Sequence, residues 1–325
     1  MKKQYLANAL RGTTLLVLVA QSLTYSNSVS ASCGASFCLI NTDWAVQGAW
    51  LDHGSRFDLR FEQVKQNQLM SGSKKLSDIE LDRFSRELET SSQRLVLNFD
   101  HGINQNWAIS ASLPFVVRQH AHLESSESVS WNYRQFGDAR IVARYQAPIQ
   151  ENARGGVSAF GVSAGLKLAN GKFDIANSTG TRAERSLQPG SGTTNLLASV
   201  YYRRVLSDFS SSWFVQANLE SPLNEKDGYK PGRSLGLDFG LRGEWGAHFS
   251  PLLQLNYQSK QRDSGLFSEP ENSGGHSLSL SPGLSYKLAP QSQVYALVQL
   301  PLQQSLRGQQ LGQKWAFTFG IQSKF

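Results

Sequence analysis

The stretch Lys314-Trp315-Ala316-Phe317-Thr318-Phe319-Gly320-Ile321-Gln322-Ser323-Lys324-Phe325 closes the chain and decides the fold. Its large apolar side chains lie on one parity, and the other parity carries small or polar residues. This period of two predicts a β-strand with one apolar face. A secreted soluble sheet would alternate in the same way, but its exposed terminal strand would rarely carry three large aromatic side chains, because such an edge invites aggregation. In a closed barrel the last strand pairs with the first and its apolar face meets lipid. We therefore expect an all-β fold, a single transmembrane antiparallel up-and-down β-barrel, with the soluble β protein as the alternative.

The apolar positions of this strand also form an expected assembly signal. A terminal Phe that closes such a run resembles the signal by which bacterial outer-membrane barrels are recognised by the barrel-assembly machinery. Ser323 departs from it, because this position is usually apolar. The sequence thus predicts two partners, outer-membrane lipid and the assembly machinery. The residues assigned to the signal are Trp315, Phe317, Phe319, Ile321 and Phe325.

Residues 1–31 have the features of a secretory signal peptide. Lys2, Lys3 and Arg11 give a basic start, an apolar run follows, and Val29-Ser30-Ala31 offers a small-residue cleavage site. We expect export through the inner membrane with cleavage of this peptide. The mature chain then has a periplasmic N-terminal segment, residues 32–54, and an outer-membrane barrel, residues 55–325.

Composition excludes two classes of protein. Beyond the signal the chain has no apolar run of about 18 residues, which excludes transmembrane helices. A barrel is allowed, since only every second residue of its strands faces lipid. The net charge of +7 and the pI of about 9.4 would suit a nucleic-acid partner. The basic residues are, however, dispersed singly among acidic ones, so we expect no nucleic-acid partner.

Cys33 and Cys38 enclose a short loop, and in an oxidising periplasm this spacing predicts a disulfide. The alternative is a thiolate pair that holds copper(I) or zinc. His120 and His122 share one parity and could join Glu124 in a metal site, or they are simply solvated loop side chains. We expect no cofactor and no resident metal. Residues 41–47 begin with capping residues and predict a short helix at the periplasmic mouth or inside the barrel.

The alternation along the chain predicts about 12 strands. Long connections at residues 66–90, 120–135 and 169–193 alternate with short turns, as an even-numbered barrel with both termini in the periplasm requires. Capping-box spacing at Ser77 and Glu80, followed by Leu81, Phe84 and Leu88, predicts a short surface helix. Residues 195–206 are apolar on both parities, so their facing stays open. The predicted strands are residues 55–64, 93–101, 107–119, 137–147, 157–168, 195–206, 213–221, 235–245, 248–259, 276–288, 293–303 and 314–325.

Short motifs across residues 130–325 are similar to those of a known family. They are Gly137-Asp138-Ala139-Arg140, Gly165-Leu166-Lys167-Leu168 with Gly171, Gln188-Pro189-Gly190-Ser191-Gly192, Ser281-Pro282-Gly283 and Gln299-Leu300-Pro301. On these motifs the chain resembles the outer-membrane barrels grouped with meta-pathway phenol-degradation proteins. Ala169-Asn170-Gly171 stands where that family usually has Pro-Thr-Gly. The resemblance implies a transporter or channel without a settled substrate, and it implies no catalytic residues.

Most charged residues of the strands fall on the parity opposite the apolar ones. An Arg near the lipid midplane costs about 2–4 kcal/mol, so these side chains must face the lumen. They are either a cross-strand network that fills a narrow interior or the walls of a wet pore that slightly favours anions. Twelve strands allow both. The candidate pore-lining residues are Arg60, Glu62, Arg94, Arg118, Arg140, Arg144, Asp238, Arg242 and Glu244.

The function favoured by the sequence is passage of small solutes across the bacterial outer membrane through a charged lumen, with the loops at 66–90 and 169–193 shaping entry. One alternative is a non-conducting structural or adhesin-like barrel. Another is a metal-handling outer-membrane protein that uses the Cys pair. An enzyme is not expected, because the adjacent His276 and Ser277 point to opposite faces of a strand and cannot form a dyad. The sequence leaves the solute open.

Overall fold

The computed structural model describes residues 40–51, 53–76, 85–124, 126–151, 155–206 and 210–325. The predicted signal peptide and the Cys33–Cys38 pair lie outside these residues. Within them, no helix is long and apolar enough to cross a membrane.

The strands follow one another along the chain with little other regular structure between them. They are β1 (Gly54–Gly72), β2 (Lys74–Lys75), β3 (Ser85–Gly102), β4 (Trp107–Glu124), β5 (Glu127–Phe136), β6 (Arg140–Gln146), β7 (Gln150–Glu151), β8 (Val157–Lys167), β9 (Asn195–Val205), β10 (Ser211–Pro222), β11 (Ser234–Gly243), β12 (Phe249–Lys260), β13 (Gly275–Ala289) and β14 (Ser292–Lys324). A single turn of 3-10 helix, η2 (Arg185–Leu187), lies in the long loop between β8 and β9.

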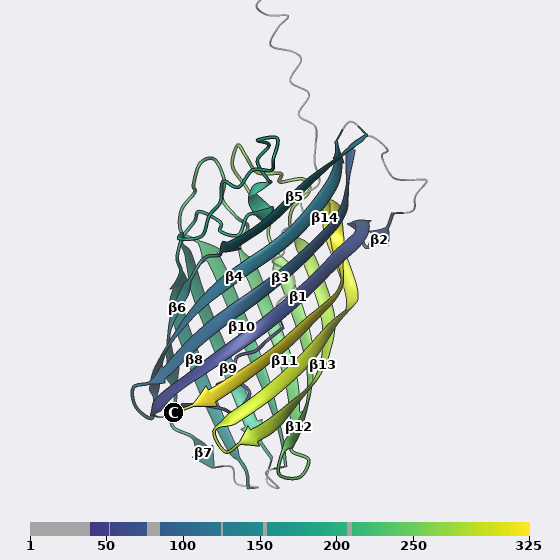
Figure 1. Cartoon of the computed structure of the whole chain (residues 1–325). Helices are drawn as coiled ribbons and strands as arrows, with labels where there is room; N and C mark the ends of the chain where they lie inside the picture. Colours follow the sequence, from purple (N-terminus) through teal and green to yellow (C-terminus); the bar gives the residue numbers. More distant parts are fainter. Residues whose placement is uncertain (1–39, 52, 77–84, 125, 152–154, 207–209) are drawn as a thin grey trace, which may run out of the picture.

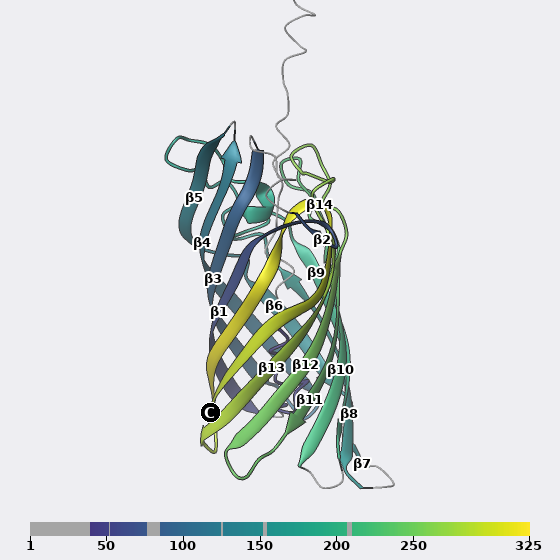
Figure 2. The same cartoon turned by 90° about the vertical axis from the view of Figure 1, so that its right-hand side faces the viewer.

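In the described part of the chain, eleven of these strands form one closed antiparallel ring. Each pairs with its neighbour in the order β1, β3, β4, β6 and β8 to β14, and β14 returns to β1. The short strands β2 and β7 pair with β1 and β8, and β5 pairs with β4. Figures 1 and 2 show the tilted strands of this barrel from two sides. The predicted up-and-down β-barrel is confirmed.

Strand β14 crosses the barrel twice. Its first part pairs with β13 and its second part with β1. At 33 residues it would be roughly 110 Å long if straight, yet Ser292 Oγ and Ser323 Oγ near its two ends lie 2.8 Å apart. Gly308, with φ +63°, lies between the two parts, where the chain reverses. The ring of eleven strands therefore has twelve crossings, as the sequence predicts.

The outer face of the barrel is apolar. Leu235, Leu237, Phe239 and Leu241 on β11 are each 42–45% exposed, while the alternate residue Asp238 is 7% exposed. The same parity rule holds for the terminal run, in which Phe319 and Ile321 are exposed and Thr318 and Gln322 are buried. On β9, Leu196 and Val200 point outward and Tyr201 points inward, which settles the facing that the sequence leaves open.

The connections differ between the two ends of the barrel. One end, the short-turn end, carries turns such as residues 103–106 and 290–291 together with the C-terminus. The other end, the long-loop end, carries residues 168–194, 223–233 and 261–274. In Figure 1 the short-turn end is at the bottom and the long-loop end at the top.

Two predicted loops are wrong over much of their length. Residues 66–72 continue β1 and residues 85–90 belong to β3, so Leu88 lies in a strand and not in a surface helix. The other predicted helical residues, 77–84, lie outside the described residues. Residues 120–124 continue β4, and 127–136 form β5. These segments lack an apolar outer face because they extend past the apolar belt, but their backbones still pair strand to strand.

Candidate functional site

Residues 40–51, the lumenal segment, run through the interior of the barrel. Residues 44–48 form a turn, in which Gln47 N donates to Asp43 O at 3.1 Å. Trp44 is 3% exposed and its ring meets Tyr295 edge-on, with 4.7 Å between centroids. Val46 is fully buried against Tyr201 and Phe214. The segment thus lies inside the barrel, which is one of the two positions predicted for residues 41–47. It forms a turn and not the predicted short helix.

Polar contacts fix this segment to the barrel wall. Asn41 Nδ2 donates to Asp238 Oδ2 at 2.9 Å and to Gln216 Oε1 at 2.5 Å. Asp43 Oδ1 accepts from Arg144 Nη1 at 2.5 Å. Arg56 Nη1 donates to Ala49 O at 2.7 Å. Because these partners lie on β1, β6, β10 and β11, the segment is attached around the circumference of the barrel.

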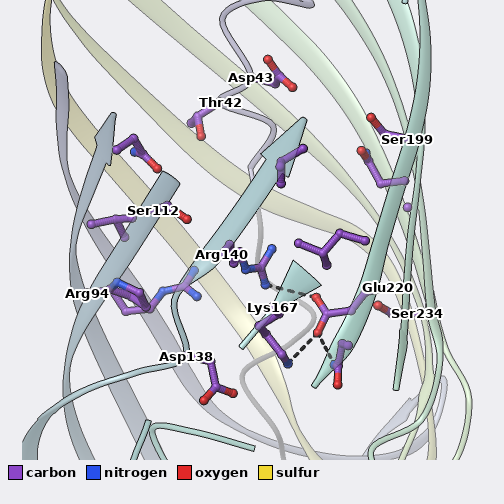
Figure 3. Close-up of a pocket in the computed structure, with 18 of the residues that line it drawn as sticks. Thr42, Asp43, Arg94, Ser112, Asp138, Arg140, Lys167, Ser199, Glu220 and Ser234 are labelled. Atoms are coloured by element: carbon purple, nitrogen blue, oxygen red, sulfur yellow. Dashed lines mark hydrogen bonds and ion pairs between the residues drawn. The ribbon is translucent and has the colours of Figure 1, made fainter. Parts of the chain in front are cut away.

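The main cavity lies between the lumenal segment and the long loops and has a volume of about 490 Å³. Residues 40–44 line its inner end, and residues 185–186, 188–191, 229 and 231–232 line its outer end. Figure 3 shows part of it: Arg140, Lys167 and Glu220 point toward one another, and Arg94 extends into the same space. The interior is therefore partly open and strongly polar.

Ion pairs within and between strands organise the middle of this cavity. Arg60 Nε and Arg94 Nη2 both contact Glu62, at 2.6 and 2.5 Å. On the other side of β4, Lys167 Nζ and Arg140 Nη2 both contact Glu220, at 2.6 and 3.1 Å. Each carboxylate is thus shared by two basic groups, which leaves positive charge in excess.

The charge of the cavity changes sign along the barrel axis. Near the lumenal segment its lining carries Arg56 and Arg144 against Asp43, Asp58, Asp100 and Asp238. Toward the long loops it carries Arg60, Arg94, Arg118, Arg140, Lys167, Arg185 and Lys260 against Glu62, Asp138 and Glu220. Lys260 is paired with Asp263 at 2.8 Å. The outer half is therefore basic and the inner half acidic.

The loop 168–194 folds over the outer end of the cavity. Arg118 Nη1 donates to Leu187 O at 2.5 Å, and the Tyr133 hydroxyl donates to the same carbonyl. Asp138 accepts from Gly171 N at 3.0 Å and from Ser191 N at 2.8 Å. The carboxylate of Asp138, which lies between β5 and β6, thus holds both ends of this loop.

The loops 223–233 and 261–274 pack against this cover. The Tyr229 hydroxyl donates to Asp263 Oδ2 at 2.8 Å, and burial together with this carboxylate raises the pKa of Tyr229. Arg185 lies over the rings of Phe173 and Tyr229, 4.5 and 5.1 Å from their centroids. Burial lowers the pKa of the Arg185 guanidinium, with part of this effect offset by Tyr229. These contacts join three loops into one lid at the outer end of the lumen.

Comparison with known proteins identifies the family. Residues 71–319 match the profile of the family described as "Putative MetA-pathway of phenol degradation". The chain belongs to this family. The resemblance read from the short motifs is therefore confirmed for the phenol-degradation family.

A solved outer-membrane structure shares the fold of this family member. The COG4313 outer membrane channel from Pseudomonas putida F1 is 10% identical, with a TM-score of 0.66 over 88% of this chain and 100% of that one. The NanC porin, 12% identical over 83% of this chain and 100% of that one, has a TM-score of 0.44. At an identity of 10%, the likeness to the channel shows a shared fold alone. The TM-score of the porin is too low to show a shared fold. No curated protein matches the sequence.

The candidate residues of this phenol-degradation family member divide between two cavities. Seven line the main cavity: Arg60, Glu62, Arg94, Arg118, Arg140, Arg144 and Asp238. Arg242 and Glu244 line a small cavity of about 290 Å³ at the short-turn end, on the other side of Gln47 and Gly48. The lumenal segment separates the two groups, so they do not form one site.

The two histidines lie on the part of β4 that pairs with β5. His120 and His122 are 2% and 5% exposed and pack against Trp131. Thr90 Oγ1 lies 2.8 Å from His120 Nδ1. Within the described residues no group of three or more metal-ligating side chains is suited to a metal ion. The histidines are therefore not solvated loop residues, because Trp131 of β5 covers them.

Sequence reasoning missed the residues that close the lumen. Asn41 is an ordinary polar residue in the sequence, and only the register of β10 and β11 places Gln216 and Asp238 beside it. Arg185 lies in a loop without periodicity. Asp138 stands in the motif Gly137-Asp138-Ala139-Arg140 at the start of a predicted strand, and the pattern does not indicate that its carboxylate holds a loop.

Proposed function

We propose that this protein is an outer-membrane channel through which small solutes pass along a charged lumen. The observation that carries the proposal is the main cavity, because it lies on the barrel axis and is lined by ionised side chains. A barrel packed solid for strength would have no such space. The channel name of the P. putida barrel, which has the same fold, supports the proposal. We propose no enzymatic activity.

The proposal fixes the orientation of the barrel. Long loops of outer-membrane barrels lie outside the cell and short turns lie in the periplasm. The loop 168–194 would therefore face the exterior, and the C-terminus would lie at the periplasmic side. Export with removal of residues 1–31, a Cys33–Cys38 disulfide and recognition of the terminal strand by the assembly machinery belong to the same proposal.

Passage requires that the lumenal segment move. It lies between the main and small cavities, and its contacts with the wall are hydrogen bonds, one partly exposed ion pair and the packing of the buried side chains of Trp44 and Val46. A hydrogen bond of this kind contributes about 0.5–1.5 kcal/mol. Exposing a buried apolar side chain such as Val46 costs about 1.5–3 kcal/mol more. Movement of the segment therefore has to break both kinds of contact, while the strand pairing that closes the barrel does not depend on it.

Single-channel conductance in a planar bilayer tests the proposal. The purified mature protein should give discrete current steps, and Arg140→Gln should lower its preference for anions. Arg134→Gln is the matched control, because Arg134 is exposed on β5 and lies outside the cavity lining. A correctly folded wild-type barrel that gives no steps over the accessible voltage range would contradict the channel. Unchanged selectivity in Arg140→Gln would remove this arginine from the path.

A further inference from the structure

Arg94 and Arg140 are only partly engaged by the carboxylates of the protein. Arg94 Nη2 contacts Glu62 Oε2 at 2.5 Å, and Arg140 Nη2 contacts Glu220 Oε2 at 3.1 Å. A guanidinium has five N–H donors, so each contact uses a small part of this capacity. The two side chains are 23% and 36% exposed, and this exposed part faces the lumen.

The two arginines converge from either side of one strand. Arg94 on β3 pairs with Val116 of β4, and Arg140 on β6 pairs with Ser112 of β4. Figure 3 shows both side chains pointing into the same part of the cavity. A molecule placed there would meet two guanidinium groups at once.

The surroundings add positive charge. Arg118 Nε donates to Ser92 Oγ at 2.9 Å, and Arg118 Nη1 donates to a backbone carbonyl. Both of these acceptors are uncharged, so neither contact neutralises the guanidinium. In a cleft with low-dielectric walls, such an excess of one charge raises the local concentration of the opposite ion.

We infer that the main cavity contains a subsite for a small oxyanion, a carboxylate or phosphate group, bound by Arg94 and Arg140. The planar guanidinium fork matches the geometry of these groups, and charge-assisted hydrogen bonds of this kind are the strong ones. The cavity volume of about 490 Å³ is that of a site for a small organic molecule. The inference rests on the proposed function and names the chemical class of its solute.

The structure allows a variant that removes the subsite and leaves the carboxylates paired. In Arg94→Gln/Arg140→Gln, Glu62 keeps Arg60 at 2.6 Å and Glu220 keeps Lys167 at 2.6 Å. The opposite variant is Glu220→Gln, which releases Arg140 from its carboxylate. A merely structural role of these residues would weaken binding in both variants, whereas an oxyanion subsite predicts opposite effects.

The test is titration calorimetry of the detergent-solubilised protein with succinate and, separately, with inorganic phosphate. Uncharged 1,4-butanediol serves as the control ligand. We expect saturable binding of at least one anion, and the better ligand shows which oxyanion fits. Binding should be roughly tenfold weaker in the double arginine variant and a few-fold tighter in Glu220→Gln. Arg134→Gln should bind like the wild type.

The inference is overturned if neither anion binds the wild type, if the double variant binds as well as the wild type, or if Glu220→Gln binds more weakly. Calorimetry does not depend on conduction. A protein that conducts but does not bind anions keeps the proposed function and loses the subsite. One that binds anions but never conducts keeps the subsite and loses the channel.

Discussion

Asp43 Oδ1 and Arg144 Nη1 lie 2.5 Å apart and join the lumenal segment to the wall strand β6. Asp100 adds a second negative charge near Arg144. The side chains of Asp43 and Arg144 are 20% and 21% exposed, so water screens the pair only in part. This ion pair, the contact between Asn41 and Asp238 and the packing of Trp44 and Val46 together hold the lumenal segment in place.

We predict that Asp43→Asn increases the conducting fraction of single-channel recordings. The substitution removes the charge of the ion pair, and a partly exposed pair of this kind contributes about 1 kcal/mol, which corresponds to about fivefold in population. Glu89→Gln is the control, because Glu89 pairs with Lys65 at 3.2 Å and lies outside both cavities. Equal open fractions in Asp43→Asn and the control would show that this contact does not hold the segment.

Gly236 and Gly240 of β11 both face the barrel interior. We predict that substitution by alanine destabilises the barrel at Gly240 and not at Gly236. A Cβ on Gly240 would lie 2.1 Å from the ring of Phe214, whereas a Cβ on Gly236 would meet nothing closer than 3.6 Å. Gly240→Ala must displace Phe214, which packs on Val46 of the lumenal segment, and such overpacking costs about 1–3 kcal/mol. Gly236→Ala should be tolerated. Thermal unfolding, followed by the loss of the folded band in unboiled gels, should show a lower midpoint for Gly240→Ala alone.

The sequence predicts the barrel well because lipid imposes a simple rule on it. Where a strand crosses the apolar belt, every second side chain must be apolar, and Phe317, Phe319 and Ile321 show this directly. Beyond the belt the rule lapses. His120 and His122 are polar like loop residues, yet they continue β4. Their side chains are covered by Trp131 of β5 and do not face lipid.

The contacts inside the barrel could not be predicted from the sequence. Asn41 and Asp238 are 197 positions apart, and their contact depends on the registers of many strands together. The same holds for Gly240 and Phe214, since a glycine under an aromatic ring is recognisable only when the two strands are aligned. Parity predicts that charges face the lumen, but not which charges meet.

We predict that Asp138→Asn loosens the loop 168–194. The carboxylate accepts from Gly171 N, Ser191 N and Ser191 Oγ, and an amide replaces one acceptor oxygen by a donor. A buried N–H left without a partner costs about 1–3 kcal/mol. Trypsin should therefore cleave after the exposed Arg182 several-fold faster in the variant. Asp174→Asn, an exposed position in the same loop, is the control, and equal cleavage in the two variants would contradict the role of Asp138.

We predict that the loop 261–274 becomes less stable as the pH rises from about 5 to 8. Burial raises the pKa of Glu269 from its ordinary 4.5 to about 7. A carboxyl whose pKa is higher in the folded loop favours the folded form when protonated, so its contribution is complete below pH 4.5 and is lost as the pH passes through 7. Hydrogen exchange of this loop, corrected for the intrinsic rate, should speed up over this range. Glu269→Gln should remove the dependence, and a variant that keeps it would assign the effect to another group.

We predict that Phe325→Ala reduces insertion of the barrel into the membrane more than it reduces the stability of the folded barrel. The Phe325 ring stacks on Phe57 with centroids 5.4 Å apart, but the closure of the ring also rests on backbone bonds between Ser55 and Phe325, which the substitution keeps. Leu302→Ala is the control, because Leu302 is 59% exposed on the same strand and loses a comparable apolar side chain. In cells, the amount of folded protein in the outer membrane should fall several-fold for Phe325→Ala and little for Leu302→Ala. Both variants should refold equally well from urea into detergent, where no assembly machinery acts. If Phe325→Ala refolds as poorly in detergent as it inserts in cells, the terminal residue acts through stability and not as a recognition signal.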